Sequence, residues 1–274
     1  KPLVLVDGIE MSLSQIPSSE IENISVLKDA ASASIYGSRA AHGVILVTTK
    51  RGKEGKVKLS YDGTIGFQDR AVRAEQVSAR EYMTMVNEAL INSGGSSKYS
   101  EDDILATERG DDPYNHSYLN WANEVYKPTY ITQHTLNLTG GSEVGRYLVS
   151  FDYLDQPGLV KNTEYQRYSY RVNTDLNIGK MLKVSSDVTY RHIDRLWPEA
   201  LGNVQYDVWS MQPTSPVKYE NGDYRLDKQN RNAISLMDLD VVGEDRYNMD
   251  VVYGQVKVDL EPVKDLVFTG MASL

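Results

Sequence analysis

The feature that most constrains the fold is a two-residue alternation of apolar and polar side chains. Residues 56–67 place lysine, serine, aspartate and threonine on one face and apolar side chains on the other: Val57, Leu59, Tyr61, Ile65 and Phe67. Successive side chains of a β-strand point to opposite faces, so this pattern predicts a strand with one apolar face. The same pattern predicts six further strands, at residues 133–139, 147–153, 165–178, 182–190, 254–260 and 266–273.

The lengths of the connections between these strands narrow the fold class. Two long segments, about 68–129 and about 194–249, alternate with shorter ones. Short turns on one side and longer loops on the other are typical of an antiparallel transmembrane β-barrel, whose apolar face meets lipid and whose polar face lines the lumen. A soluble β-rich binding or adhesion module predicts similar alternation and stays open as the alternative. Seven strands cannot complete an even-numbered barrel, so we expect the chain to be part of a longer one.

The first 54 residues follow a different, α/β pattern. Short apolar strands are predicted at 3–6 and 21–27, and a serine-capped turn is predicted between them, at 17–20. We therefore divide the chain into an α/β segment, residues 1–54, and a mostly β segment, residues 55–274.

The stretch VLKDAASASIYGSRAAHGVILVTTKRG, residues 26–52, contains the third strand of the α/β segment. Asp29 is predicted to cap an alanine-rich helix, residues 30–36, which Gly37 would end. Gly43 precedes a strand at 44–50, whose unbroken apolar run predicts burial on both faces. The basic residues that follow are expected to reach solvent: Lys50, Arg51 and Lys53.

Composition and motifs argue against an enzyme and against a nucleic-acid partner. The chain carries 38 Asp and Glu against 29 Lys and Arg, a net charge of −9, whereas a nucleic-acid-binding surface is positive. Cysteine is absent, the four histidines are scattered, and no P-loop or GxSxG motif occurs. We therefore predict no catalytic residue, no metal site and no cofactor. The acidic pairs Asp102-Asp103 and Asp111-Asp112 are interpreted as solvated loop charges, with calcium binding as the alternative.

Several motifs carry a family resemblance. PLVLVDGIE, SEIENISVLKDAASASIYGSRAAHGVILVTTKRGKEG and VKLSYDGTIGFQ resemble the plug-to-barrel junction of SusC/RagA-type TonB-dependent outer-membrane transporters. Downstream, LNLTGGSEVGRYLVSFDYLDQPGLVKNTEYQRYSYRVNTDLNI resembles the first barrel strands of that family. One departure is His42, where the family carries Asn. The plug signature comprises Lys28, Asp29, Tyr36, Gly37, Arg39 and Gly43.

The resemblance implies a specific architecture and activity. Residues 1–54 would be the C-terminal part of a plug domain, and residues 55–274 the first strands of a 22-stranded barrel. The complete protein would sit in the outer membrane of a Gram-negative, Bacteroidota-like bacterium. It would import oligosaccharides or oligopeptides with a SusD-like surface lipoprotein. TonB would supply energy through a segment missing from this chain.

The first long loop is expected to be ordered and to contain ligand-contacting aromatic residues. Ser78 to Glu81 has the capping-box spacing, and Ser100 is placed to cap a second helix. Aromatic faces stack on sugar rings, and loop backbone hydrogen bonds would equally serve a peptide. The candidates for ligand contact are Tyr114, Tyr118, Trp121 and Trp209. For Trp121, packing within the loop is the favoured alternative.

Charged residues on the polar face are expected to form ion pairs with the plug or with one another. They are Arg167, Arg171, Asp175, Lys183, Asp187 and Arg191. From the plug side, Arg39 is expected to contact the barrel wall, because a lone cation among small residues needs a partner.

Overall fold

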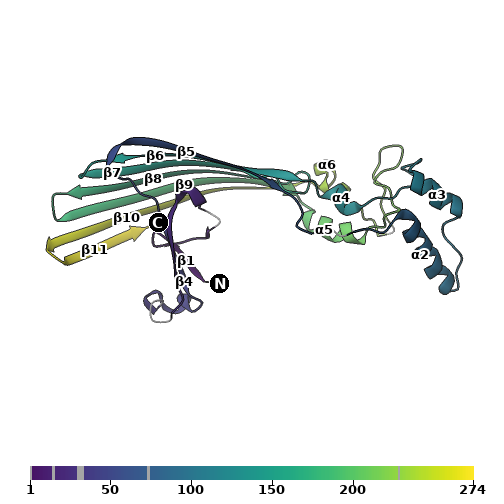
Figure 1. The fold of residues 1–274 in the computed structure, drawn as a ribbon, viewed down its shortest axis with the longest axis horizontal. Helices are drawn as coiled ribbons and strands as arrows, with labels where there is room; N and C mark the ends of the chain where they lie inside the picture. Colours follow the sequence, from purple (N-terminus) through teal and green to yellow (C-terminus); the bar gives the residue numbers. More distant parts are fainter. Residues whose placement is uncertain (1, 14–15, 30–33, 73–74, 228) are drawn as a thin grey trace.

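The fold consists of two sheets joined by a short link. A computed structural model describes the chain except for residues 1, 14–15, 30–33, 73–74 and 228. A four-stranded sheet has the order β2-β1-β4-β3, and a seven-stranded sheet has the order β11-β10-β9-β8-β7-β6-β5. We name them the plug sheet and the wall sheet (Figure 1).

The plug sheet is built around its most apolar strand. Its strands are β1 (Leu3–Val6), β2 (Ile9–Glu10), β3 (Ile21–Leu27) and β4 (Val44–Thr49). β4 lies between β1, to which it is parallel, and β3, to which it is antiparallel. Val44 packs into one cluster with Leu3 and Leu5, and Val47 packs into another with Val6 and Ile16. Both faces of β4 therefore contribute to cores, as the apolar run predicts.

Two local predictions in the plug are not confirmed: the serine cap at 17–20 and the helix at 30–36. The turn at Ser18–Glu20 has no side-chain cap, because Pro17 occupies its N-cap position and has no hydrogen-bonding side chain. The Ser19 hydroxyl donates instead to Thr135 of the wall sheet, at 3.0 Å. The predicted helix at 30–36 begins in residues 30–33, which lie outside the described residues. From Ser34 to Ala40 the chain forms 3₁₀ turns interrupted at Gly37, whose φ of 68° requires a residue without a β-carbon.

All seven predicted strands are present in the wall sheet, and each is antiparallel to its neighbours. β9 and β10 are longer than predicted. The prediction stopped short because their loop-side ends carry polar side chains, such as Asp194 and Arg246, where apolar ones would continue the alternation. The sheet has open edges at β5 and β11. The strands are β5 (Gly55–Gln68), β6 (Thr129–Gly141), β7 (Gly145–Asp155), β8 (Glu164–Ile178), β9 (Leu182–Pro198), β10 (Glu244–Val263) and β11 (Leu266–Ser273).

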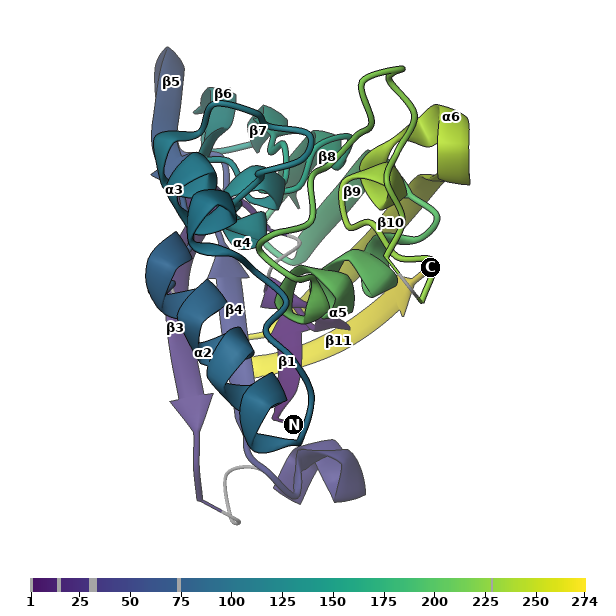
Figure 2. The same ribbon diagram turned by 90° about the vertical axis from the view of Figure 1, so that its right-hand side faces the viewer.

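The two faces of the wall sheet have opposite polarity. The sheet curves, and the plug strands lie inside the curve (Figure 2). We call the face toward the plug the inner face and the other the outer face. Large apolar side chains are exposed on the outer face, among them Leu59, Tyr61, Tyr170, Val172, Leu176 and Val188. The inner face buries polar side chains, among them Ser150, Asp152, Arg171, Asn173 and Asp187.

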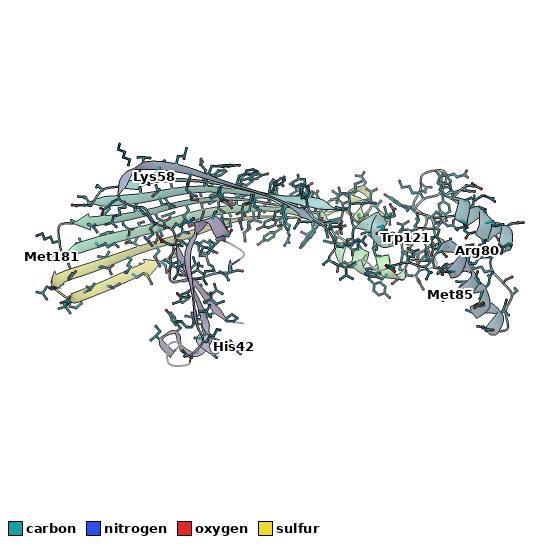
Figure 3. All side chains as sticks on the ribbon, in the orientation of Figure 1. His42, Lys58, Arg80, Met85, Trp121 and Met181 are labelled. Atoms are coloured by element: carbon teal, nitrogen blue, oxygen red, sulfur yellow. The ribbon has the colours of Figure 1, made fainter. Side chains whose placement is uncertain are left out.

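The long loops fold into helices at one end of the wall sheet. Met181 marks the short-turn end, and Arg80 lies at the opposite, loop end (Figure 3). The capping box predicted at Ser78 is present, and the cap predicted at Ser100 is also a capping box, with Asp103. No helix in the described part of the chain is long and apolar enough to cross a membrane. The loop helices are α2 (Ala79–Asn92), α3 (Glu101–Arg109), α4 (Trp121–Val125), α5 (Leu201–Ser210), η4 (Ser235–Met237) and α6 (Leu239–Val242).

Candidate functional site

The plug is held to the inner face by a buried arginine. Arg171 on β8 pairs with Asp7 (Nη2 to Oδ2, 2.8 Å) and with Glu20 (Nη1 to Oε2, 3.4 Å), and it also donates to Thr49. Glu20 in turn accepts a hydrogen bond from Ser150 on β7 at 2.7 Å. The Arg171 side chain is 7% exposed, so its charge depends on these plug carboxylates for compensation.

A second arginine makes the reverse contact, from the plug side to the wall. Arg51 follows β4 and pairs with Asp187 at 2.6 Å and Asp175 at 3.3 Å. Burial acts to lower the pKa of Arg51, but these carboxylates outweigh burial and raise the pKa above its usual value. The expectation that Arg51 reaches solvent is therefore wrong. Its neighbour Lys53 is exposed, as expected.

The link from the plug to the first wall strand passes directly over β7. A β-carbon on Gly52 would clash with the backbone nitrogen and carbonyl oxygen of Tyr147. Only glycine permits this approach without a shift of one backbone. Gly52 therefore lets the chain pass close enough to β7 for the adjacent Arg51 to contact the inner face.

The plug signature lies away from this interface. Arg39, expected to contact the wall, pairs instead with Glu10 of the plug at 3.0 Å and is 72% exposed. The reason is its position in the 3₁₀ segment beside His42, at the end of the plug remote from the wall (Figure 3). Tyr36 packs on the core cluster around Val44, and Gly43 adopts a φ of 87° beside the Leu27 carbonyl. Lys28 and Asp29 are exposed beyond the end of β3.

Most other predicted inner-face charges form the expected pairs. Arg167 pairs with Asp152 at 3.0 Å, both buried, and Lys183 lies 3.9 Å from Asp175. Arg191 departs from the prediction. Its Nε donates to Ser169 at 3.4 Å and its guanidinium lies 6.0 Å from the Tyr253 ring centroid, but no ion pair forms with it among the described residues.

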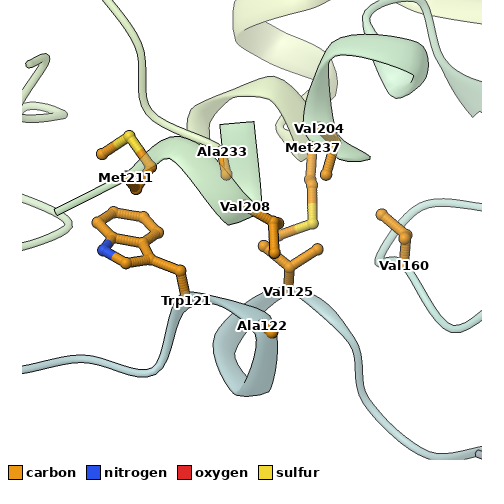
Figure 4. Packing of buried hydrophobic residues seen from close by; sticks show 9 residues of the cluster. All are labelled: Trp121, Ala122, Val125, Val160, Val204, Val208, Met211, Ala233 and Met237. Atoms are coloured by element: carbon orange, nitrogen blue, oxygen red, sulfur yellow. The ribbon is translucent and has the colours of Figure 1, made fainter. Parts of the chain in front are cut away.

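The loops share a hydrophobic core that contains Trp121 (Figure 4). Trp121 is 3% exposed, and its indole N–H donates to the Gln212 carbonyl at 3.1 Å. It packs with Val208 and Met211, so α4 of the first loop and α5 of the second are held together. Because neither ring face is free, the structure corrects the ligand-contact prediction for Trp121 in favour of packing.

Tyr114 and Tyr118 line one cavity, of about 410 Å³, between the two long loops. Leu119, Pro216 and Val217 contribute to its mostly apolar wall. Burial raises the pKa of Tyr118, whose hydroxyl donates to the Val77 carbonyl at 2.5 Å. Trp209 lies on α5 and is 62% exposed, outside this cavity. The structure thus brings two of the four candidate aromatic residues together.

A larger, polar cavity of about 690 Å³ adjoins the first one, and His116 and Ser117 line both. The acidic residues nearby have local structural partners. Asp103 caps α3, and Asp112 accepts backbone hydrogen bonds from Tyr114 and Asn115. Across the described residues, no three His, Asp or Glu side chains gather in a way that could hold a metal ion.

A row of aromatic and imidazole side chains crosses the outer face near the loop end. His134, Tyr153, Tyr168 and His192 are direct neighbours on successive strands. His134 stacks on Tyr153, and His192 lies 2.8 Å from Asp250 on β10. Aromatic side chains at such a level are typical of the membrane–water interface.

The functional residues missed by sequence reasoning are those of the plug: Asp7, Glu20, Thr49 and Arg51. A signal for Arg51 was present. Asp175 and Asp187 fall on the polar faces of adjacent predicted strands, and neighbouring carboxylates of this kind need a cation.

Comparisons with known proteins agree with this geometry. Residues 1–44 match the TonB-dependent Receptor Plug Domain family. TonB-dependent receptor P26 of Formosa agariphila is 31% identical over 82% of this chain and 22% of its own length. TonB-dependent receptor SusC of Bacteroides thetaiotaomicron is 32% identical over 63% of this chain and 17% of its own length. The chain thus spans about a fifth of the length of these curated relatives.

Among solved structures, the RagAB peptide transporter has a matching fold. It superimposes with a TM-score of 0.77 at 22% identity, over 99% of this chain and 34% of that one. This match covers both the plug sheet and the wall sheet. Together with the plug match and the relatives, it identifies the chain as a segment of a TonB-dependent receptor of the SusC/RagA type, comprising part of the plug and the first strands of the barrel.

Proposed function

We propose that the protein to which this chain belongs is an energy-coupled nutrient importer in the outer membrane of a Gram-negative, Bacteroidota-like bacterium. One observation carries the proposal: the wall sheet is apolar on its exposed outer face and polar on the inner face that binds the plug. Water would penalise so large an exposed apolar surface, whereas lipid would cover it.

The height of the apolar band supports a position in a bilayer. On β8 the band runs from Tyr168, in the aromatic row, to Ile178 near the short turn. Ten residue steps of about 3.4 Å give about 34 Å along the strand. A tilt of about 40° reduces this to about 26 Å along the membrane normal, close to the ~25 Å band of outer-membrane barrels.

The partners and substrates are proposed from the relatives. A SusD-like lipoprotein would cover the loop end, and TonB would act through a segment outside this chain. The substrate would be an oligosaccharide or an oligopeptide; one solved relative is described as a peptide transporter. We propose Tyr114, Tyr118 and Trp209 as the aromatic loop residues that contact it, because the two tyrosines line a cavity and Trp209 is exposed.

Fractionation and uptake test this proposal against a soluble binding module. The full-length protein should sediment with outer membranes and require detergent for extraction. Cells that contain it should accumulate fluorescent oligosaccharides or oligopeptides, and a protonophore should abolish the accumulation. Recovery of the intact protein in the soluble fraction without detergent would contradict the proposal.

A further inference from the structure

Two inner-face arginines, Arg191 and Arg195, form no ion pair among the described residues, unlike the three that hold the fold together. Arg171, Arg167 and Arg51 each pair with a carboxylate. Arg195, on β9 toward the loop end, makes no ion pair within the described ranges, and its buried Nε has no hydrogen-bond partner. A partly buried arginine without an ion pair or a partner for its N–H donors destabilises the fold unless another group accepts hydrogen bonds from it.

Aromatic rings hold the Arg195 guanidinium in place. Its Cζ lies 3.5 Å from the Trp197 ring centroid and 4.9 Å from that of Tyr247. The Trp197 indole is fixed in turn, because its N–H donates to Asp245 at 2.5 Å. Cation–π contacts of this kind stabilise the cation but satisfy none of its N–H donors.

The cluster lies on the inner face, between the plug and the loops. Tyr165, Arg195 and Tyr247 are direct neighbours on β8, β9 and β10. Arg195 stands four residues from Arg191 on the same face, on the loop side of the plug contacts. Arg191 itself is 3% exposed beneath the plug, whereas Arg195 is only half-buried and Tyr247 is exposed. A ligand that enters from the loop end would therefore meet Arg195 before it meets the plug.

We propose that Arg195, flanked by Trp197 and Tyr247, is a subsite for a carboxylate group of the imported oligomer. The two rings cover the faces of the planar guanidinium, and the N–H groups along its edge remain available to bind both oxygens of a carboxylate. The same rings offer faces for a sugar or an apolar side chain. This inference rests on the proposed import function and narrows its substrate to acidic oligomers, either uronic-acid oligosaccharides or peptides rich in acidic residues.

Binding to the purified full-length transporter, with its lipoprotein partner, tests the subsite. The probes are tetragalacturonate against maltotetraose, and a glutamate-containing hexapeptide against its glutamine analogue. One acidic probe should bind at least tenfold more tightly than its neutral analogue, and Arg195→Gln should remove that advantage. Arg195→Lys, which keeps the charge but loses the planar fork, should retain part of it.

Arg246→Gln is the matched control, because Arg246 lies on the adjacent strand near the same end but on the outer face, paired with Asp194 at 3.4 Å. It should bind the acidic probe as wild type does.

Three results would overturn the subsite: equal affinity of acidic and neutral probes, failure of both acidic probes to bind, or unchanged acidic-probe affinity in Arg195→Gln. Protonophore-sensitive uptake of neutral oligomers alone would leave the import function intact while rejecting the subsite. Absence of any such uptake would reject import, and the binding assay would still decide the subsite.

Discussion

At the scale of single residues, the plug is held by a small number of buried charges rather than by an apolar core. Arg171 belongs to the wall and meets two plug carboxylates, whereas Arg51 belongs to the link and meets two wall carboxylates. Both arginines are compensated only while plug and wall are in contact, whereas Asp175 also lies 3.9 Å from Lys183 of the wall. Such an interface is specific in register, because each buried charge must meet its partner.

Replacing Arg171 with Met should weaken the plug–wall contact by about 3–5 kcal/mol, because it leaves Asp7 and Glu20 buried without a cation. The measurement is dye or antibiotic permeability of cells that carry the full-length protein, which should rise. Arg246→Met removes an exposed ion pair, of the kind worth about 0–1 kcal/mol, and should leave permeability unchanged. Equal leak from both variants would contradict the assignment.

Gly52→Ala should displace the link and cost about 1–3 kcal/mol, because the new methyl group overlaps the Tyr147 backbone. Thermal unfolding of the full-length protein measures the cost. Gly202→Ala is the control, since its position on α5 has open space and alanine favours a helix. If Gly52→Ala were as stable as wild type, the proposed close approach of link and β7 would be refuted.

At the scale of elements, the sequence was sufficient to predict the strands of the wall sheet but not the side-chain contacts between distant parts of the chain. Alternation is a local property, so seven strands and their faces could be predicted before any partner was known. The capping boxes at Ser78 and Ser100 are equally local. The predicted serine cap before Glu20 is absent because Pro17 occupies the N-cap position. The Ser19 hydroxyl has a distant partner, Thr135, which no local pattern encodes.

The same limit applies to the functional contacts. Arg39 and Arg51 are both cations near small residues, yet one is exposed and the other is inserted into the inner face. The difference comes from the path of the chain over β7, which depends on tertiary structure. Trp121 and Tyr114 are likewise both loop aromatics, and only packing against α5 separates a core residue from a cavity-lining one.

Acid should loosen the start of α3. Hydrogen bonds from Ser100 lower the pKa of Asp103, with a smaller contribution from His116. A carboxyl whose folded pKa is depressed stabilises the helix above its unfolded pKa, about 3.9, and loses that contribution as pH falls through the folded value. The protection factors of the amide hydrogens in residues 101–109, corrected for the intrinsic exchange rate at each pH, should therefore fall below about pH 4.

Ser100→Ala is the matched variant for this prediction. It removes the cap at about 1 kcal/mol and should accelerate exchange in α3 already at neutral pH. The acid-induced loss of protection should then be smaller than in wild type, since Asp103 has lost its main partner, the Ser100 hydroxyl. An unchanged pH profile in this variant would argue against the cap as the titrating element.

At the scale of the whole molecule, the polarity of the wall sheet determines its surroundings. Val172 lies in the middle of the exposed outer face, and Glu164 lies near the loop end of the same strand and face. Val172→Arg should destabilise the inserted protein by about 2–4 kcal/mol, whereas Glu164→Arg should cost about 0–1 kcal/mol. Denaturant titration of the full-length protein in lipid vesicles measures both. Equal costs at the two depths would contradict a lipid-facing outer surface.

The most direct test is to measure which face of the wall sheet contacts lipid when the protein is in a bilayer. This chain has no cysteine, so single cysteines can be placed at Tyr170, Val172 and Val188 on the outer face and at Ser169 and Thr189 on the inner face. In the full-length protein, with any other cysteine replaced, a fluorophore at each position is exposed to brominated lipid. We predict quenching at the three outer positions and none at the two inner ones. Quenching that fails to alternate, or that is absent from all five positions, would contradict a membrane-spanning wall with a plug on its inner face.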